Sequence, residues 1–222
     1  WHNSYSDYVS SKLKIFNFTR NDQYNFLGPV DEELKIKNSL IKNVTVIEGI
    51  DEYSLPNYFD EFVSMFVTVC SRFEISKNDV IEFLSSEPSM EHRFELFYSK
   101  NGVNFINDSK STNPESVNKA SLKVNNCMLI MHGLTKGTNS NKFVLSNEIK
   151  KILVPKSTEF DLSMYKSIVI KYESIQELEL LIKENYQDFN TVLFSCGGAS
   201  FSDFDNYIDR GNYFKKMIAG KI

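Results

Sequence analysis

A run of polar residues stands between an apolar segment and a proline near the middle of the chain. Residues 108–113 read Asp-Ser-Lys-Ser-Thr-Asn, and Pro114 follows, a residue typical of the first position of a helix. This run offers a carboxylate, a cation, hydroxyls and an amide within one turn. In open α/β sheets, ligands bind where a strand ends and the next helix begins. The alternative is a polar turn whose Ser and Thr only cap the helix.

Two junctions of the same kind follow later in the sequence. Residues 132–137 come after the apolar run 127–131, and residues 195–200 come after the apolar run 191–194. Because the carboxyl ends of parallel strands lie at one edge of a sheet, we expect these loops to converge with the first. Lysines, hydroxyls and a helix N-terminus together suit an anion, either phosphate or carboxylate. The side chains expected at this edge are Asp108, Lys110, Thr112, Lys136 and Ser200.

The elements that must position these loops follow from hydrophobic periodicity. Asn101-Gly102 is typical of a two-residue hairpin turn and predicts that the strands on either side of it pair. Strands then alternate with helices, which predicts an α/β fold with a Rossmann-like, mostly parallel sheet and helices on both faces. The expected strands are 94–98, 103–106, 127–131, 167–170 and 191–194, and the expected helices are 114–122, one near 143–151, 174–185 and 201–217.

The first part of the chain has a different pattern. Ser85 to Ser89 interrupts it, so we expect two domains, 1–89 and 90–222. The chain begins with Trp1 and not with Met, so we also expect a segment upstream. The elements expected before the boundary are a helix over 5–17, a short strand over 44–47, a helix that starts at Pro56, and a helix capped by Ser76 that runs through Leu84.

Composition excludes several classes of protein. With 41% hydrophobic and 14% aromatic residues, the 222 residues can bury a sizeable core. The net charge of -4 comes from 25 basic and 29 acidic residues that are well mixed, which argues against nucleic-acid binding. No run of about 18 apolar residues is present, so we expect no membrane span. Cys70, Cys127 and Cys196 form no Cys-x-x-Cys pair, and we expect buried free thiols in a reducing cytoplasm.

Several well-known catalytic motifs are absent from the sequence. It contains no G-x-x-x-x-G-K-[ST] phosphate loop, no dinucleotide-binding G-x-G-x-x-G and no G-x-S-x-G elbow. No group of His, Cys or carboxylate residues has the spacing of a metal site. These absences disfavour a hydrolase and a structural zinc site. We interpret His2, His92 and His132 as ordinary polar or capping histidines.

Several segments of the sequence carry a resemblance to a known family. His92 to Glu95, Gly102-Val103 and Phe105 to Glu115 together resemble the Mur ligases, which build the stem peptide of peptidoglycan. Other members, and the folylpolyglutamate synthases, carry a different segment here. The form Asn-Asp-Ser-Lys-x-Thr-Asn at 107–113 therefore indicates the branch that adds D-glutamate. Two further blocks are similar to family signatures: Ser195 to Asn206 with Arg210-Gly211, and Tyr8 to Phe16.

The resemblance implies a domain assignment and a reaction. Residues 1–89 would be the C-terminal portion of a central ATP-binding domain, and residues 90–222 the Rossmann-like domain for the incoming amino acid. The family uses ATP and Mg²⁺ to join D-glutamate to UDP-N-acetylmuramoyl-L-alanine through an acyl phosphate. We expect a cytoplasmic monomer with no nucleic-acid or membrane partner. Because these 222 residues lack the phosphate loop, we expect them to be inactive alone.

The resemblance also implies roles for particular residues. Lys12 matches a lysine that is carbamylated and helps to hold magnesium, although composition alone makes it a surface lysine. Lys12 and Lys110 are the expected catalytic residues. Asn57, Arg93 and Asp108 match residues that bind ATP. The residues that match the D-glutamate pocket are Lys110, Thr112, Lys136, Ser200, Phe201 and Tyr207.

The chain departs from the family pattern at a few positions. The usual His-Asn-x-x-Asn reads Asn57-Tyr58-Phe59-Asp60 after Pro56, and His132-Gly133 replaces Gly-Gly. Cys196-Gly197-Gly198 stands where Pro-Ala-Cys is usual. Two alternatives therefore stay open: a Mur-type ligase for a different amino acid, and a degenerate, non-enzymatic ligase-like binding module.

Overall fold

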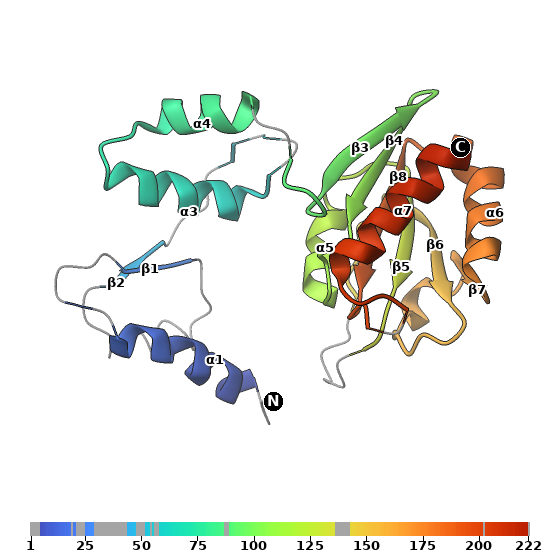
Figure 1. Cartoon of the computed structure of the whole chain (residues 1–222), viewed down its shortest axis with the longest axis horizontal. Helices are drawn as coiled ribbons and strands as arrows, with labels where there is room; N and C mark the ends of the chain where they lie inside the picture. The colour runs from blue at the N-terminus through green and yellow to red at the C-terminus, as the bar shows by residue number, and fades with distance from the viewer. Residues whose placement is uncertain are drawn as a thin grey trace. The chain divides into compact units, whose positions relative to one another are not determined.

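The computed structural model describes residues 5–18, 20, 25–28, 44–47, 52–53, 55, 58–86, 89–135, 143–201 and 203–221. The chain divides into two compact units, Trp1–Pro88 and Ser89–Ile222. Figure 1 labels the helices and strands of both units.

The first unit is built from helices and a small sheet. The helix α1 (Tyr5–Leu13) continues into the 3-10 helix η1 (Lys14–Phe18). Strands β1 (Asn25–Leu27) and β2 (Val44–Val46) pair in parallel. Two further helices, α3 (Asp60–Ser71) and α4 (Lys77–Ser86), enclose a small core. The buried members of that core are Leu55, Tyr58, Val63, Cys70, Val80 and Leu84.

Helix starts in this unit follow local capping chemistry. Ser76 caps α4 as predicted, because its hydroxyl accepts the Asp79 amide at 3.2 Å while the Asp79 carboxylate accepts the Ser76 amide at 3.3 Å. The predicted helix start at Pro56 was wrong for α3, which begins at Asp60. Phe59 is extended and serves as the N-cap residue, and acidic side chains favour the first turn that follows it. Pro56 itself lies outside the described residues.

The second unit is an α/β domain around one sheet, and the predicted fold class is confirmed. The strand order is β3-β4-β8-β5-β6-β7, and all neighbours run parallel except the hairpin pair β3 and β4. The strands are β3 (Glu95–Lys100), β4 (Val103–Asp108), β5 (Cys127–His132), β6 (Ile149–Pro155), β7 (Val169–Tyr172) and β8 (Thr191–Gly197). The helices are α5 (Pro114–Ser121), α6 (Ile175–Asn185) and α7 (Tyr207–Lys221), with the short 3-10 helices η2 (Ser163–Tyr165) and η3 (Tyr186–Asp188).

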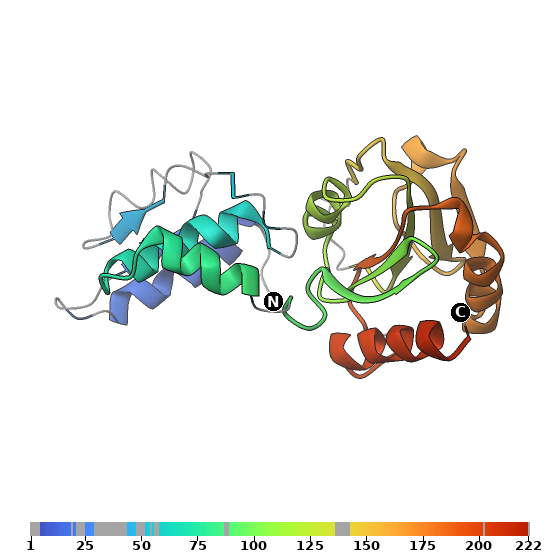
Figure 2. The ribbon, with the colours of Figure 1, turned by 90° about the horizontal axis from the view of Figure 1, so that it is seen from above.

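Helices cover both faces of this sheet, with α6 and α7 on one side and α5 on the other (Figure 2). Every residue of β5 and β8 is buried, as expected for continuous apolar strands in the centre of a covered parallel sheet. On the α6 and α7 side, Phe214 stacks on Phe194 with ring centroids 4.3 Å apart. The core on this side also includes Ile182 and Met128, both fully buried.

Two predicted elements of the second unit need correction. The helix expected near 143–151 does not form, and Ile149 instead begins β6. A short apolar run fits a buried helix and a buried strand equally well, and here pairing of 149–153 with β5 decides for the strand. The last helix starts at Tyr207 and not near 201, because the Asn206 side chain accepts amide bonds from Ile208 and Asp209 at 2.8 and 2.9 Å.

All three cysteines are free and buried. Within the described ranges, no helix is long and apolar enough to cross a membrane. The same ranges contain no group of three or more His, Cys, Asp or Glu side chains that could hold a metal ion.

Candidate functional site

The three loops singled out in the sequence begin on neighbouring strands. β8 pairs in parallel with β4 on one side and with β5 on the other. Asp108 lies opposite Ser195, and His132 lies opposite Gly197. The ends of β4, β8 and β5 therefore share one edge of the sheet, which we call the carboxyl edge.

Asp108 is the centre of a hydrogen-bond network at the carboxyl edge. Its side chain is 4% exposed. One carboxylate oxygen accepts the Ser111 hydroxyl at 2.5 Å and the Ser195 hydroxyl at 2.7 Å, and the other accepts the Phe94 amide at 3.2 Å. Burial raises the pKa of the carboxyl to about 6, while these bonds and the charge of Arg93 act against that rise. Asp108 thus ties the loop after β4 to β8 and to the turn before β3.

Lys110 and Tyr207, two residues predicted for one pocket, are in contact. The Lys110 ammonium nitrogen lies 3.8 Å from the centroid of the Tyr207 ring. The Lys110 amide also donates to the His92 carbonyl at 3.0 Å, which fixes the backbone of the loop. The face of an aromatic ring attracts a cation through its quadrupole and supplies no negative charge.

The polar run does more than cap a helix. Asn113 is the N-cap of α5, and its side chain accepts the Ser116 amide at 2.9 Å. Ser111 binds Asp108, and the Ser109 hydroxyl donates to the Tyr207 carbonyl at 2.8 Å. The cap therefore comes from the Asn113 side chain. Two hydroxyls of the run bind elsewhere instead, Ser111 to the end of β4 and Ser109 to the start of α7.

Four other predicted site residues of this unit lie in loops or turns next to its strands. Thr112 is half-buried beside the α5 cap. Ser200 is buried three residues after β8 ends, and its carbonyl accepts the Phe204 amide at 3.1 Å. The neighbouring Phe201 is 74% exposed. Arg93 is exposed in the turn before β3.

The turn that carries Arg93 is held by a buried histidine. His92 adopts a positive φ of 63°, and its Nδ1 accepts the Asn107 side-chain amide at 2.8 Å. Burial is the main cause that lowers the pKa of His92. Gly211 lies against the ring, because a Cβ on that glycine would be 2.3 Å from His92 Nδ1. The Arg-Gly pair of the C-terminal signature thus allows α7 to approach the turn closely.

His132, the last residue of β5, is also buried. Its Nε2 lies 3.3 Å from an Asp203 carboxylate oxygen, and its ring meets the Phe204 ring edge-on. Burial and the charge of Arg210 lower the pKa of His132 to about 4, and Asp203 acts in the opposite direction. The neutral imidazole therefore belongs to the packing of the carboxyl edge.

The remaining three predicted site residues are Lys12, Asn57 and Lys136. Lys136 and Asn57 lie outside the described residues. Lys12 belongs to the first unit, where it is exposed on α1 with its ammonium 5.6 Å from the Tyr8 ring centroid.

Sequence reasoning missed Arg210. This arginine is fully buried in α7 and donates to backbone or hydroxyl oxygens of Ser109, His132 and Gly198. In the sequence, Arg210 was marked only by its place in the C-terminal signature, and the resemblance assigned it no role. A buried cation is unusual enough to identify, but its burial cannot be seen in one sequence.

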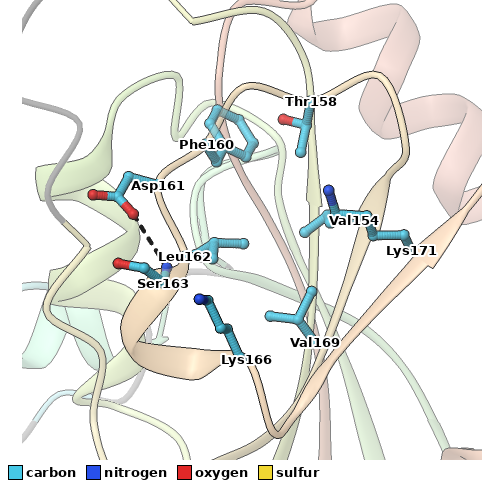
Figure 3. A pocket seen from close by; sticks show the side chains of 9 residues that line it. All are labelled: Val154, Thr158, Phe160, Asp161, Leu162, Ser163, Lys166, Val169 and Lys171. Atoms are coloured by element: carbon cyan, nitrogen blue, oxygen red, sulfur yellow. Dashed lines mark hydrogen bonds between the residues drawn. The ribbon is translucent and has the colours of Figure 1, made fainter.

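A pocket of about 440 Å³ lies elsewhere in the same unit, beside β6 and β7 (Figure 3). Asp161 accepts the Ser163 amide at 3.1 Å, and the ends of Lys166 and Lys171 are exposed. None of the predicted site residues lines it. The lining residues of this β6–β7 pocket are Val154, Thr158, Phe160, Asp161, Leu162, Ser163, Lys166, Val169 and Lys171.

Comparison with curated proteins finds relatives named UDP-N-acetylmuramoylalanine–D-glutamate ligase. No family model matches the chain. It is 27% identical over 259 residues to the UDP-N-acetylmuramoylalanine–D-glutamate ligase of Natranaerobius thermophilus, covering 98% of this chain and 56% of that protein. It is 33% identical over 198 residues to the same-named ligase of Buchnera aphidicola, covering 85% of this chain and 43% of that protein. The chain thus spans about half the length of the curated relatives it matches.

Solved structures show the same fold at low sequence identity. A crystal structure of MurF from Acinetobacter baumannii matches with a TM-score of 0.65 at 14% identity, over 98% of this chain and 55% of that one. UDP-N-acetylmuramate-alanine ligase MurC from Thermotoga maritima matches with a TM-score of 0.64 at 15% identity, over 99% of this chain and 56% of that one. The resemblance to the Mur ligases is therefore confirmed, with D-glutamate ligases as the relatives in sequence and Mur ligases as the relatives in fold.

Proposed function

We propose that the chain is the C-terminal part of an ATP-dependent ligase that adds D-glutamate to UDP-N-acetylmuramoyl-L-alanine. Residues 1–89 would complete the ATP-binding domain, and residues 90–222 would bind the incoming amino acid. The names of the curated relatives support the reaction. The observation that carries the proposal is the carboxyl edge, where the Asn107 to Asn113 segment ends β4 beside the ends of β8 and β5.

The chemistry of D-glutamate suits the side chains expected at this edge. The substrate carries two carboxylates and the amine that attacks the acyl phosphate. Lys110 and Lys136 would neutralise the carboxylates, and the hydroxyls of Thr112 and Ser200 would donate hydrogen bonds to them. Lys110 suits this role because, among the described residues, it is the Tyr207 ring that faces its ammonium group, 3.8 Å away. Holding the amine in line with the acyl phosphate is the main work of such a site.

ATP and magnesium would be held by residues from both parts of the chain. Arg93 is exposed and can approach a phosphate. Asp108 would accept a ribose hydroxyl through the oxygen that also accepts the Phe94 amide, since the Ser111 and Ser195 hydroxyls both bind the other oxygen. Asn57 is the remaining ATP contact that we propose. The exposed Lys12 can react with carbon dioxide to give a carbamate, an oxygen ligand of the kind that Mg²⁺ accepts.

The test uses the full-length protein and, separately, the 222-residue chain. ADP release by the full-length protein should require both UDP-N-acetylmuramoyl-L-alanine and D-glutamate. The 222 residues alone should release none, because they contain no phosphate loop. Turnover with L-lysine or diaminopimelate but not with D-glutamate would identify a ligase for another amino acid. D-glutamate-dependent ADP release by the 222-residue chain would contradict its proposed inactivity.

A ligase-like binding module without catalysis is the second candidate. Asp60 stands where the family motif has its last Asn, and its carboxylate accepts the Tyr53 amide at 3.1 Å at the start of α3. That bond ties Asp60 to the segment before α3, which fits a structural role. The upstream sequence discriminates between the candidates: an intact G-K-[ST] loop supports the enzyme, and its loss supports the module.

A further inference from the structure

Arg210 connects the three loops of the carboxyl edge. Its Nε donates to the Ser109 hydroxyl at 3.1 Å, and one terminal nitrogen donates to the Ser109 carbonyl at 2.8 Å. The other terminal nitrogen donates to the carbonyls of His132 and Gly198, both at 3.0 Å. Ser109 follows β4, His132 is the last residue of β5, and Gly198 follows β8. One guanidinium therefore holds the loops after all three strands.

The charge of Arg210 is buried, and the described groups that accept its hydrogen bonds carry no charge. The side chain is 0% exposed. Among the residues that the structure describes, all of its hydrogen-bond acceptors are neutral oxygens. Removing a cation from water is costly, and hydrogen bonds to carbonyls offset only part of that cost. The positive charge of Arg210 acts on groups at this edge, as it does on His132, where Asp203 acts in the opposite direction.

The backbone packs closely around the guanidinium of Arg210. A Cβ on Gly133 would lie 2.8 Å from an Arg210 terminal nitrogen and 2.3 Å from the Ala199 carbonyl oxygen. Gly133 also has a φ of +119°, a conformation that favours glycine. The Leu134 and Ala199 backbones exchange two hydrogen bonds of 2.9 Å. The loops after β5 and β8 are thus clamped together directly above the guanidinium.

The residues held by Arg210 adjoin the proposed substrate contacts. Ser109 precedes Lys110, and Gly198 stands two residues before Ser200. We propose that Arg210 is a positioning residue of the amino-acid pocket, an inference that rests on the function proposed above. It sets the spacing between the loop of Lys110 and the loop of Ser200, and its buried charge attracts the carboxylates of the substrate. It does not touch the substrate itself.

The experiment compares Arg210→Lys and Arg210→Gln with the wild type in the full-length protein. Gln removes the charge and most of the donors, so the KM for D-glutamate should rise on the order of 10-fold to 100-fold. Lys keeps the charge but lacks the planar guanidinium, so the KM of Arg210→Lys for D-glutamate should rise less than that of Arg210→Gln. The KM for ATP and the kcat should change by less than about threefold, because the loops and not the reacting groups are altered.

A matched control separates positioning from loss of stability. Ile182→Ala removes a fully buried side chain of α6 from the same unit and should lower the melting temperature. It should leave the KM for D-glutamate unchanged. Ser109→Ala is a milder second variant that removes one acceptor of Arg210, and its KM for D-glutamate should rise several-fold even if the Arg210 variants do not fold.

The outcomes separate this proposal from the function on which it rests. A wild-type protein with no D-glutamate-dependent turnover overturns both. Wild-type turnover, with the KM for D-glutamate within twofold of wild type in the folded Arg210 or Ser109 variants, overturns the positioning role alone. Equal rises in the KM for all three substrates also overturn it, because a general structural defect would produce them.

Discussion

The carboxyl edge and the β6–β7 pocket belong to one sheet but are built in different ways. At the edge, Asp108 and Arg210 are buried, and their hydrogen bonds join loops from three strands. The pocket is lined by apolar side chains such as Val154 together with the exposed Lys166 and Lys171 (Figure 3). The pocket has several apolar lining residues, whereas the edge has the fixed polar groups. Recognition of a small charged substrate depends on fixed polar groups, so the edge is the better candidate site.

The largest expected effect compares one lysine from each region. In the full-length protein, Lys110→Ala should lower activity on the order of 100-fold or more, as losing one preorganised charge at a reacting site does. Lys136→Ala should act in the same direction. Lys166→Ala, in the β6–β7 pocket, should leave turnover unchanged. Steady-state rates at saturating and limiting D-glutamate measure all three effects. A normal rate for Lys110→Ala would mean that the carboxyl edge is not the better candidate site.

The buried carboxylate of the edge should make stability depend on pH. The pKa of Asp108 is raised by burial from 3.8 to about 6 in the folded chain. A raised pKa means that Asp108 stabilises the fold at low pH, and this contribution is lost as the pH rises through about 6. Relative to Asp108→Asn, the wild type should therefore gain about 2 kcal/mol of unfolding free energy between pH 7 and pH 4.

Hydrogen exchange of the β8 amides measures this free energy for the second unit. Subtracting the variant cancels the histidines, including His132, whose lowered pKa makes it act in the opposite direction as the pH falls from 6.5 toward 4. A difference between wild type and Asp108→Asn that does not vary with pH would mean that Asp108 is not the buried titrating group.

Two glycines of α7 test how tightly the edge is packed. Gly211→Ala places a methyl group 2.3 Å from His92 Nδ1, so it should destabilise the fold by about 1 kcal/mol or more. Gly220→Ala meets nothing within 4 Å in the same helix, so it should stabilise the fold by about 0.5 kcal/mol. Thermal melting of the two variants measures the contrast, and similar shifts for both would argue against close packing at His92.

Much of the sheet was predictable from the sequence, for physical reasons. β5 and β8 are buried on both faces, so they read as continuous apolar runs, and the hairpin turn has the Asn-Gly pair that its positive φ values require. β6 was misassigned because its pattern alone does not separate a strand from a helix, and its pairing with β5 joins residues about twenty apart in sequence.

The candidate site was predictable only in part. The loop carrying Lys110 could be found because it follows an apolar strand, and parallel topology implied that other strand ends would lie nearby. The hydrogen-bond partners of Asp108 and Ser109, which precede Lys110, could not be found. Ser195 reaches Asp108 across 87 positions, and Arg210 reaches Ser109 across 101 positions. Such pairs depend on how three loops meet in space, and single-sequence patterns carry no information on that.

The smallest expected effect contrasts hydroxyls of the two regions. In the β6–β7 pocket wall, the buried Thr158 hydroxyl has no hydrogen-bond partner among the described residues. Thr158→Val keeps the shape and removes the unsatisfied group, so the free energy of unfolding should stay equal or rise by up to about 1 kcal/mol. Ser195→Ala takes a donor from the buried Asp108 carboxylate, so it should lower that free energy by about 1 kcal/mol or more. Hydrogen exchange of β8 measures both. A loss of stability in Thr158→Val would mean that the pocket wall, like the edge, depends on its polar groups.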